Sequence, residues 1–386
     1  MNSRYPAISA NLGLWSGRVW PVVLAALLGT LAVFYFWYGL PGQTPALNDF
    51  GSFWASGAAA LEGRNPYGVY PETFHIEGTD IVHPNLNPPA SLLLFAPLSL
   101  MDPHLTMKLI WWSGLLAYLA IVVAAARGVS DSSAVLPVSM WALALPAFWD
   151  SLRLGQIYVL LLFVVACAWF LLRRQRLAAA GILIGIFVAL KPIFVLWPLM
   201  LFVTGHLRAS AWAGLAFAAV SLMPLLVFGP DVYGQWLDLV LSEAGNRKAA
   251  FPNATVMAIG YRAGSPVIGM LLPALVLVWA ALRIRQEHLS LAEASAIGIA
   301  LGIAISPVAW FHYLLFLLPA MLSRRWSAGL LAGAAIMVLP VALLHVVYEQ
   351  LPALYPALAE PIRATAGSPF SWATLFLLGA LGRGSR

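Results

Sequence analysis

Charged residues and cysteines are both scarce in this sequence. Asp, Glu, Lys and Arg make up only 9% of the 386 residues, whereas hydrophobic residues make up 61%. A soluble domain carries roughly 25% charged residues, so the composition excludes an ordinary water-soluble globule and, for the same reason, a disordered chain. The single cysteine, Cys167, excludes an intrachain disulfide bond.

Sequence motifs for metals, nucleotides and nucleic acids are also missing. No His, Cys and carboxylate residues have the spacing of a zinc site, and no GxxxxGK phosphate loop occurs. The formal net charge of +6 would suit a nucleic-acid-binding protein, but no basic stripe with interleaved aromatic residues is present. We therefore expect no nucleic-acid partner, no metal site and no cofactor, although the sequence leaves a requirement for a divalent metal open.

Long apolar runs dominate the chain. They are continuous rather than alternating, which is typical of transmembrane helices and not of transmembrane strands. With about 20 apolar residues per span, the length allows a bundle of about 10–12 transmembrane helices, the first near residues 18–39. The runs broken at Lys191-Pro192 and Ser306-Pro307 are expected to be bent or discontinuous. The sequence thus predicts an all-α polytopic membrane protein, with residues 1–386 forming one integral membrane domain.

The distribution of charge predicts the orientation in the membrane. Most Lys and Arg residues lie in short loops, whereas most acids lie in three long loops near residues 40–104, 229–264 and 347–368. Because cytoplasmic loops carry an excess of basic residues, we expect a multi-pass protein of the plasma (inner) membrane with both termini cytoplasmic. The long loops are then extracytoplasmic, and membrane lipids surround the bundle.

The first long loop contains the most informative segment. Phe50, Phe53 and Trp54 fall on one face of a predicted amphipathic helix that ends near Gly63 and lies in the membrane interface. Asp49 stands at its start, where it is either a helix cap or a functional carboxylate at the membrane boundary. A second short interfacial helix is predicted after Pro88-Pro89, because proline is tolerated in a first helical turn.

Further polar groups lie at the same predicted outer helix ends. Arg153 and Gln156 precede an apolar span, and Lys191 and His312 follow others. Lys191 could be a snorkelling anchor and His312 a packing residue. Cations and hydrogen-bond donors that face one carboxylate would instead fit a general base and an anionic substrate. Arg247-Lys248, in the second long loop, could contact a phosphate, but a solvated pair is slightly favoured.

Together these features resemble a known family, the membrane glycosyltransferases of family 87 in the GT-C class. The matching positions, in chain order, are Asp49, Gly63 to Tyr67, Pro88-Pro89, Gly155-Gln156, Lys191-Pro192, and Ser306-Pro307 through Trp310 to His312. The chain departs from the family pattern at three positions. Asn87 replaces an aromatic residue, Tyr158 replaces a polar one, and Tyr313 replaces a second histidine.

The resemblance implies a GT-C-type bundle with interfacial helices in the first outer loop, and an inverting glycosyltransferase of the cell envelope. The implied donor is a polyprenyl-phosphate sugar, with a hexose such as mannose, and the implied acceptor is a glycolipid or glycan. Asp49 would be the catalytic base. The implied substrate-binding residues are Arg153, Gln156, Lys191, His312, Asn65 and Tyr67, of which Arg153, Lys191 and His312 would hold the leaving phosphate.

Two other classes of function compete with this interpretation. A transporter or flippase of lipid-linked sugars would also place polar groups among broken helices. No internal repeat is visible, however, and the polar residues gather at one face rather than at the bilayer midplane. A non-catalytic scaffold would leave the long polar loops without a role.

Overall fold

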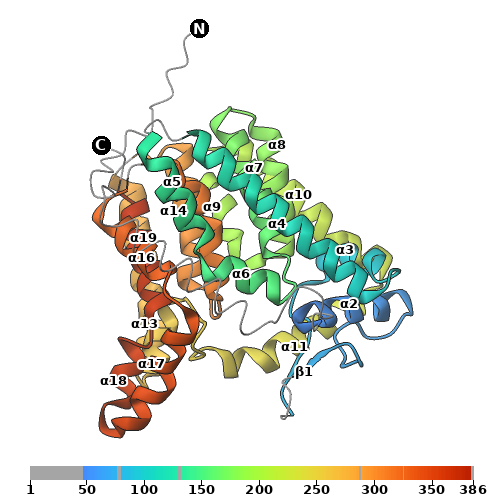
Figure 1. Cartoon of the computed structure of the whole chain (residues 1–386). Coiled ribbons are helices and arrows are strands. Elements are labelled where there is room, and N and C mark those ends of the chain that lie inside the picture. The colour runs from blue at the N-terminus through green and yellow to red at the C-terminus, as the bar shows by residue number, and fades with distance from the viewer. Residues whose placement is uncertain (1–46, 76–79, 129–131, 287, 325, 384–386) are drawn as a thin grey trace.

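The computed structural model describes residues 47–75, 80–128, 132–286, 288–324 and 326–383, and these form a mostly helical molecule (Figure 1). The expected span near residues 18–39 lies outside the described residues. The elements up to the first broken helix are α2 (Asn48–Leu61), β1 (Phe74–His75), β2 (Val82–His83), η2 (Pro89–Ser91), α3 (Leu92–Leu98), α4 (Pro103–Gly128), α5 (Ser132–Leu143), α6 (Pro146–Arg153), α7 (Tyr158–Arg173) and α8 (Leu177–Leu190).

The second half continues with helices of mixed length. These are η3 (Pro192–Val195), α9 (Leu196–Val203), α10 (Leu207–Val227), α11 (Asp231–Arg247), α12 (Val256–Arg262), α13 (Pro266–Gln286), α14 (Leu291–Ile305), η4 (Phe311–Leu317), α15 (Leu318–Leu322), α16 (Ala328–Met337), α17 (Val341–Leu354), η5 (Pro356–Leu358), α18 (Ala359–Ala364) and α19 (Pro369–Leu381). The segments expected as the second and third outer loops are therefore largely helical.

The polytopic helical architecture predicted from the sequence is confirmed, but the helices of spanning length are fewer than predicted. Among the described residues, 5 helical segments are long and apolar enough to cross a membrane, or up to 6 if the pair α16 and α17, bent by 83°, is one span. The other apolar runs form helices of 10–17 residues, several of them ended by proline, which cannot donate the next helical hydrogen bond.

The two predicted breaks are both present. Helix α8 ends at Leu190, and Pro192 begins the 3₁₀ helix η3. Helix α14 ends at Ile305, and the chain runs extended through Ser306 before η4 begins at Phe311. Each break leaves polar side chains beside apolar helices, because Lys191 lies at the first break and His312 directly after the second.

Glycine residues let helices α8 and α10 approach each other closely. A Cβ atom on Gly181 or Gly185 of α8 would lie 2.4 or 2.3 Å from the carbonyl oxygens of Ala209 and Ala213 of α10. Such distances are possible only for glycine, so Gly181 and Gly185 form a helix-packing face of α8 against α10.

Helix α2 is the predicted amphipathic helix, and it is fixed to the turn between α6 and α7. The backbone N–H of Phe50 donates to the carbonyl oxygen of Leu154 over 3.1 Å, and the Asn48 amide donates to that of Arg153 over 2.9 Å. The alternative interpretation of Asp49 as a helix cap is wrong, because Leu47 occupies the N-cap position and no side chain caps α2. The Asp49 side chain is therefore not used as a helix cap.

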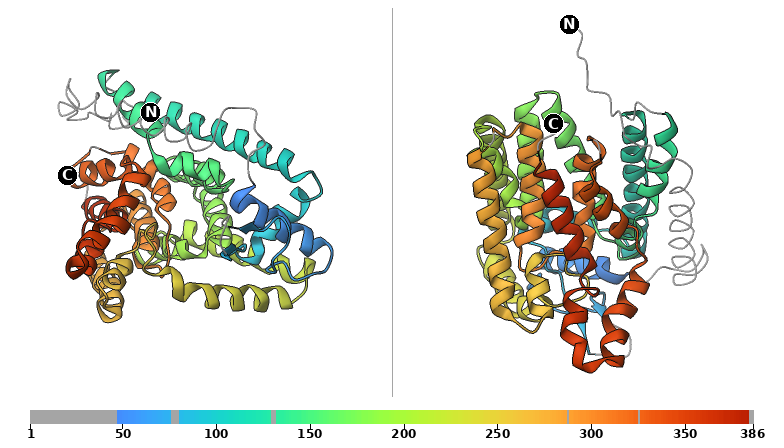
Figure 2. Two further views of the ribbon diagram at one scale, coloured as in Figure 1. Left: turned by 60° about the horizontal axis from the view of Figure 1, so that its bottom comes forward. Right: turned by 90° about the vertical axis from the view of Figure 1, so that its left-hand side faces the viewer.

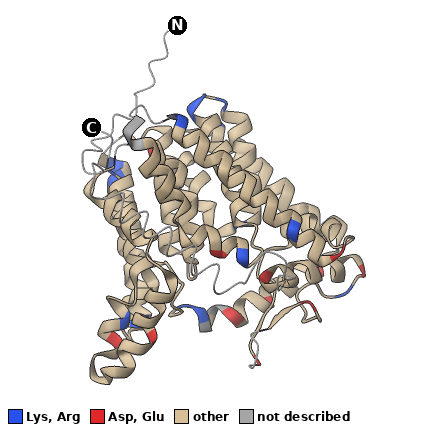
Figure 3. Cartoon of the chain, viewed as in Figure 1, with Lys and Arg blue, Asp and Glu red and all other residues tan. Residues whose placement is uncertain are grey.

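Charge divides between the two ends of the bundle. In Figure 3 the upper end carries almost only Lys and Arg, whereas the lower end carries most of the acids together with further basic residues. The lower end also holds α2, β1, α11, α17 and α18. Figure 2 shows α11 crossing this end, from the C-terminal helices toward α2. The polar elements of the three predicted outer loops thus gather at one end of the molecule.

Candidate active site

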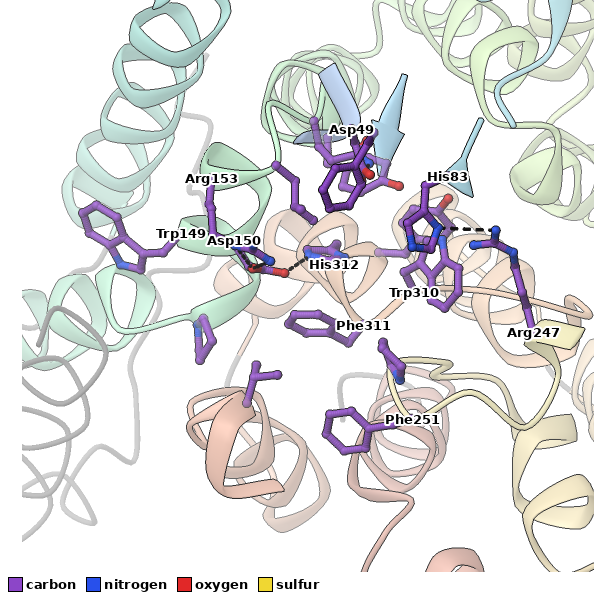
Figure 4. Close-up of a pocket in the computed structure, with 18 of the residues that line it drawn as sticks. Asp49, His83, Trp149, Asp150, Arg153, Arg247, Phe251, Trp310, Phe311 and His312 are labelled. Atoms are coloured by element: carbon purple, nitrogen blue, oxygen red, sulfur yellow. Dashed lines mark hydrogen bonds and ion pairs between the residues drawn. The ribbon is translucent and has the colours of Figure 1, made fainter. Parts of the chain in front are cut away.

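A cavity of about 770 Å³ lies among the elements of this end. It brings together five of the seven predicted site residues, namely Asp49, Arg153, Gln156, Lys191 and His312. Its other lining residues include His83, Asn87, Trp149, Asp150, Tyr158, Arg247, Phe251, Trp310, Phe311, Tyr313, Val341 and Val346. Figure 4 shows how several of these side chains surround it.

Asp49 projects from the first turn of α2. Its Oδ2 atom accepts a hydrogen bond of 2.5 Å from the side-chain amide of Gln156, which follows the α6–α7 turn. Gly155 makes this turn possible, because it has a φ of +64° and its missing Cβ would lie 2.5 Å from the Cβ of Phe50. Burial raises the pKa of Asp49 above its ordinary value of 3.8, and the hydrogen bond from Gln156 partly opposes that rise.

Asp150 is the second carboxylate of the cavity, and two basic side chains hold it. Its Oδ1 atom accepts a hydrogen bond of 2.8 Å from Arg153 Nε, three residues further along α6. Its Oδ2 atom lies 2.8 Å from Nε2 of His312, which comes from η4 (Figure 4). Arg153 and His312 are therefore already bonded to a carboxylate.

Lys191 lies at the break after α8 and is only 7% exposed. Its Nζ atom donates a hydrogen bond of 2.6 Å to Oδ1 of Asn87. The same atom lies 4.6 Å from the ring centroid of Tyr158 and 5.5 Å from that of Tyr313. The three positions at which the chain departs from the family pattern thus meet around one ammonium group.

The opposite side of the cavity carries a third basic group. Arg247, at the end of α11, is paired with Glu243 and lies 3.5 Å from Nδ1 of His83. The favoured expectation that Arg247 is solvated is wrong, because its side chain is only 16% exposed and lines the cavity. Burial, together with the nearby Arg247 charge, lowers the pKa of His83.

Apolar side chains form much of the remaining wall. They come from α6, from the loop before α12, from η4 and from the first turns of α17, and they are Trp149, Phe251, Phe311, Val341 and Val346. The cavity therefore offers charged and apolar surface side by side, which suits an amphipathic ligand.

Asn65 and Tyr67 do not line the cavity, unlike the other predicted residues. Oδ1 of exposed Asn65 accepts from the backbone N–H of Tyr67 over 2.9 Å, which closes a turn after α2. The Tyr67 hydroxyl is buried and donates to the carbonyl oxygen of Asn87 over 3.2 Å. Tyr67 therefore contacts the loop that carries Asn87, whereas Asn65 fixes the turn that holds Tyr67.

Sequence reasoning missed His83 and gave Asp150 no specific role. Asp150 did leave a local signal, because its spacing from Arg153 is typical of a helical ion pair. His83 left none, since its partner Arg247 is 164 positions away. Among the described residues, no three His, Cys, Asp or Glu side chains are grouped so that they could hold a metal ion.

The arrangement can support proton transfer beside an anionic group. Asp49 is held by the neutral amide of Gln156. Three basic side chains, those of Arg153, Lys191 and Arg247, line the same cavity. Such a carboxylate can accept a proton, while the cations stabilise negative charge that develops on a leaving group.

The amino-acid sequence has recognisable relatives. A sequence profile described as Glycosyltransferase family 87 matches residues 85–307, more than half of the chain. The polyprenol-phosphate-mannose-dependent alpha-(1-2)-phosphatidylinositol mannoside mannosyltransferase of Mycobacterium tuberculosis is 27% identical over 350 residues, which cover 83% of this chain and 78% of the relative. A corresponding phosphatidylinositol pentamannoside mannosyltransferase of Mycolicibacterium smegmatis is 25% identical over 285 residues, covering 70% of this chain and 67% of the relative.

Among solved structures, ArnT from Cupriavidus metallidurans bound to undecaprenyl phosphate is similar, with a TM-score of 0.41 and 16% sequence identity. The match covers 94% of this chain and 77% of that one.

Proposed function

Because the chain belongs to glycosyltransferase family 87, we propose that it transfers a hexose such as mannose from a polyprenyl-phosphate donor to a glycolipid or glycan acceptor. The two mycobacterial relatives support this donor class, since their names specify polyprenol-phosphate-mannose as the donor and phosphatidylinositol mannosides as acceptors. The cavity adds physical support, because it combines a carboxylate, several cations and an apolar wall.

In the proposed reaction, Asp49 is the general base. An acceptor hydroxyl oxygen attacks the anomeric carbon, and its proton passes to the Asp49 carboxylate. The bond between the anomeric carbon and the phosphate oxygen breaks, and polyprenyl phosphate leaves with the bonding electrons. A single direct displacement of this kind inverts the configuration at the anomeric carbon.

The observation that carries this assignment is the difference between the two carboxylates of the cavity. Asp150 is bonded to Arg153 and to His312, whereas the hydrogen bond to Asp49 comes from the neutral amide of Gln156. A carboxylate that is already paired with cations is a weaker proton acceptor, because those charges stabilise its ionised form. Asp49 is therefore the better base.

The leaving phosphate is assigned to the cationic side of the cavity. Arg153, Lys191 and His312 all line the cavity and offer the donors that a phosphate oxyanion needs. The prenyl chain would lie along the apolar wall that includes Phe251, Val341 and Val346. Gln156, which is hydrogen-bonded to Asp49, would orient the acceptor hydroxyl or the sugar.

We further propose that both termini are cytoplasmic and that the cavity opens on the extracytoplasmic side. The basic end of the bundle supports this orientation, because positively charged loops stay in the cytoplasm. Single cysteines introduced into a Cys167→Ala background test it in intact cells. A cysteine at Ser242 of α11 should react with a membrane-impermeant thiol reagent, whereas one at Gln175, in the α7–α8 turn, should react only after lysis. The reverse pattern would invert the orientation.

The proposed reaction is tested with purified protein in lipid nanodiscs and a panel of polyprenyl-phosphate sugars radiolabelled in the sugar. Transfer of label to a glycolipid or glycan, with the anomeric configuration of the product inverted, is the expected result. Movement of intact donor across a sealed vesicle, without any labelled product, would instead support a transporter of lipid-linked sugars.

A further inference from the structure

The ammonium group of Lys191 is held by three side chains from separate segments. Asn87 precedes η2, Tyr158 begins α7 and Tyr313 lies in η4. The amide oxygen of Asn87 accepts one N–H of Lys191 over 2.6 Å, while the faces of the two tyrosine rings lie 4.6 and 5.5 Å from Nζ. We refer to Asn87, Tyr158 and Tyr313 as the ammonium clamp.

The clamp contains no negative charge, which sets Lys191 apart from two other cations of the cavity. Arg153 forms an ion pair with Asp150, and Arg247 forms one with Glu243. Within the described part of the chain, no carboxylate forms an ion pair with Lys191. Its charge at the cavity wall is therefore not cancelled by a contacting acid.

The clamp also leaves hydrogen-bonding capacity unused. An ammonium group has three N–H donors, and Asn87 takes one of them. Aromatic ring faces attract a cation through the ring quadrupole, without accepting a conventional hydrogen bond and without a formal charge. Within the described part of the chain, two N–H groups of Lys191 thus remain for a ligand, although the side chain itself is buried.

We propose that Asn87, Tyr158 and Tyr313 are positioning residues that hold the ammonium group of Lys191 in place and direct its two remaining N–H donors to the phosphate of the prenyl donor. The inference rests on the proposed function and goes beyond it by assigning the recognition of the lipid phosphate to one cation and its three neutral neighbours. All three clamp positions are also those at which the sequence departs from the family pattern. The clamp is therefore a feature of this chain's own donor site.

The variant Asn87→Asp tests the proposal, because Asp has nearly the same shape as Asn but places a negative charge against Lys191. A purely structural role predicts no loss that is specific to the phosphate, because the carboxylate still accepts from Lys191 and the hydrogen bond of 2.8 Å from the Asn87 amide to Oδ1 of Asn85 is lost for both probes alike. The proposal predicts that farnesyl phosphate, a short probe with the phosphate but little chain, binds at least about tenfold more weakly. Farnesol, which lacks the phosphate, should bind as it does to the unmodified protein.

Tyr158 provides a second, independent variant pair. Tyr158→Phe keeps the ring face and should bind farnesyl phosphate within about twofold of the unmodified protein. Tyr158→Leu keeps most of the apolar volume but removes the face, and should weaken binding about three- to thirtyfold, the usual range for a cation–π contact. Farnesol binding should be the same for both variants.

The matched charge control is Gln350→Glu, on an exposed position of α17 outside the cavity lining, which should leave the binding of both probes unchanged. Equal weakening of farnesyl phosphate and farnesol by Asn87→Asp, or no weakening of either, would overturn the clamp. These binding measurements do not depend on turnover. If the binding results contradict the clamp, the labelled-sugar assay still tests sugar transfer. If no sugar transfer is observed, the binding measurements still test recognition of the phosphate.

Discussion

The two aspartates of the cavity have the same side chain and different surroundings. Asp49, at the start of α2, accepts a hydrogen bond from one neutral amide, and burial raises its pKa. Asp150, in α6, is bonded to a guanidinium group and an imidazole. The difference shows that the partners of a carboxylate, rather than its presence in a cavity, decide whether it can act as a base or serves to fix cations.

The contrast extends to the way in which the two residues are positioned. Asp150 and Arg153 lie one helical turn apart, so that α6 alone brings them together. Asp49 depends on contacts far along the chain, because Phe50 and Asn48 bind backbone carbonyls of the α6–α7 turn. The proposed base is thus held by tertiary structure, which fixes it against the other groups of the cavity.

The largest loss of sugar transfer is expected from a substitution of Asp49. Asp49→Asn keeps the size of the side chain but removes its ability to accept a proton at neutral pH, so sugar transfer should fall by about two to four orders of magnitude. A carboxyl group with a raised pKa destabilises the folded protein above that pKa, because the native state then carries a poorly solvated charge. The Asn variant should therefore melt at the same temperature as the unmodified protein or higher. Turnover, farnesyl phosphate binding and melting temperature are measured on one preparation.

The matched variant Asp150→Asn should have a smaller effect. It removes the charge that Arg153 and His312 share but retains an oxygen that can accept from one of them. Hydrogen bonds to charged groups contribute about 1.5–3 kcal/mol, so transfer should fall roughly ten- to hundredfold. The same turnover assay checks this. If Asp150→Asn abolished transfer and Asp49→Asn did not, the roles of the two residues would be exchanged.

The pH dependence of sugar transfer tests the role of Asp49 in the unmodified protein. The proposed base must be ionised, and burial raises the pKa of Asp49 above 3.8. Activity should therefore fall on the acidic side at a pH higher than an ordinary aspartate would give. Burial and the nearby Arg247 charge lower the pKa of His83, which favours the neutral form of that side chain. The profile of kcat/KM against pH is the measurement, and an acidic limb at or below the ordinary value would contradict the assignment.

Part of the site was predictable because its signals are local. The helix around Phe50 and Phe53, the break at Pro192 and the close approach at Gly181 each follow from residues near one another in the sequence. The catalytic candidate Asp49 follows from its place after the first predicted span, at the start of such a helix, together with the family resemblance. Its expected capping alternative failed because Leu47, one residue before the helix, took the N-cap position.

The remainder depends on pairs that are distant in sequence. His312 meets Asp150 across 162 positions, and Lys191 meets Asn87 across 104. No periodicity or local motif specifies such pairs, because they arise only when the broken helices pack. For the same reason the sequence alone favours a solvated Arg247, although the fold brings this residue to His83 and to the cavity.

The smallest expected effect concerns Gln156, which donates a hydrogen bond to Asp49. Gln156→Leu removes the hydrogen bond of 2.5 Å that partly opposes the effect of burial, so the pKa of Asp49 should rise further and the acidic limb of the pH profile should move to higher pH. Well above that limb the Asp49 carboxylate is ionised with or without the amide, so transfer should fall less, by about two- to tenfold. The melting temperature should also fall, because the variant leaves the buried Asp49 carboxylate without this donor, and an unsatisfied buried acceptor costs about 1–3 kcal/mol. Gln175→Leu, at an exposed turn, is the control. A reduced rate with an unmoved limb would mean that Gln156 acts on the substrate rather than on Asp49.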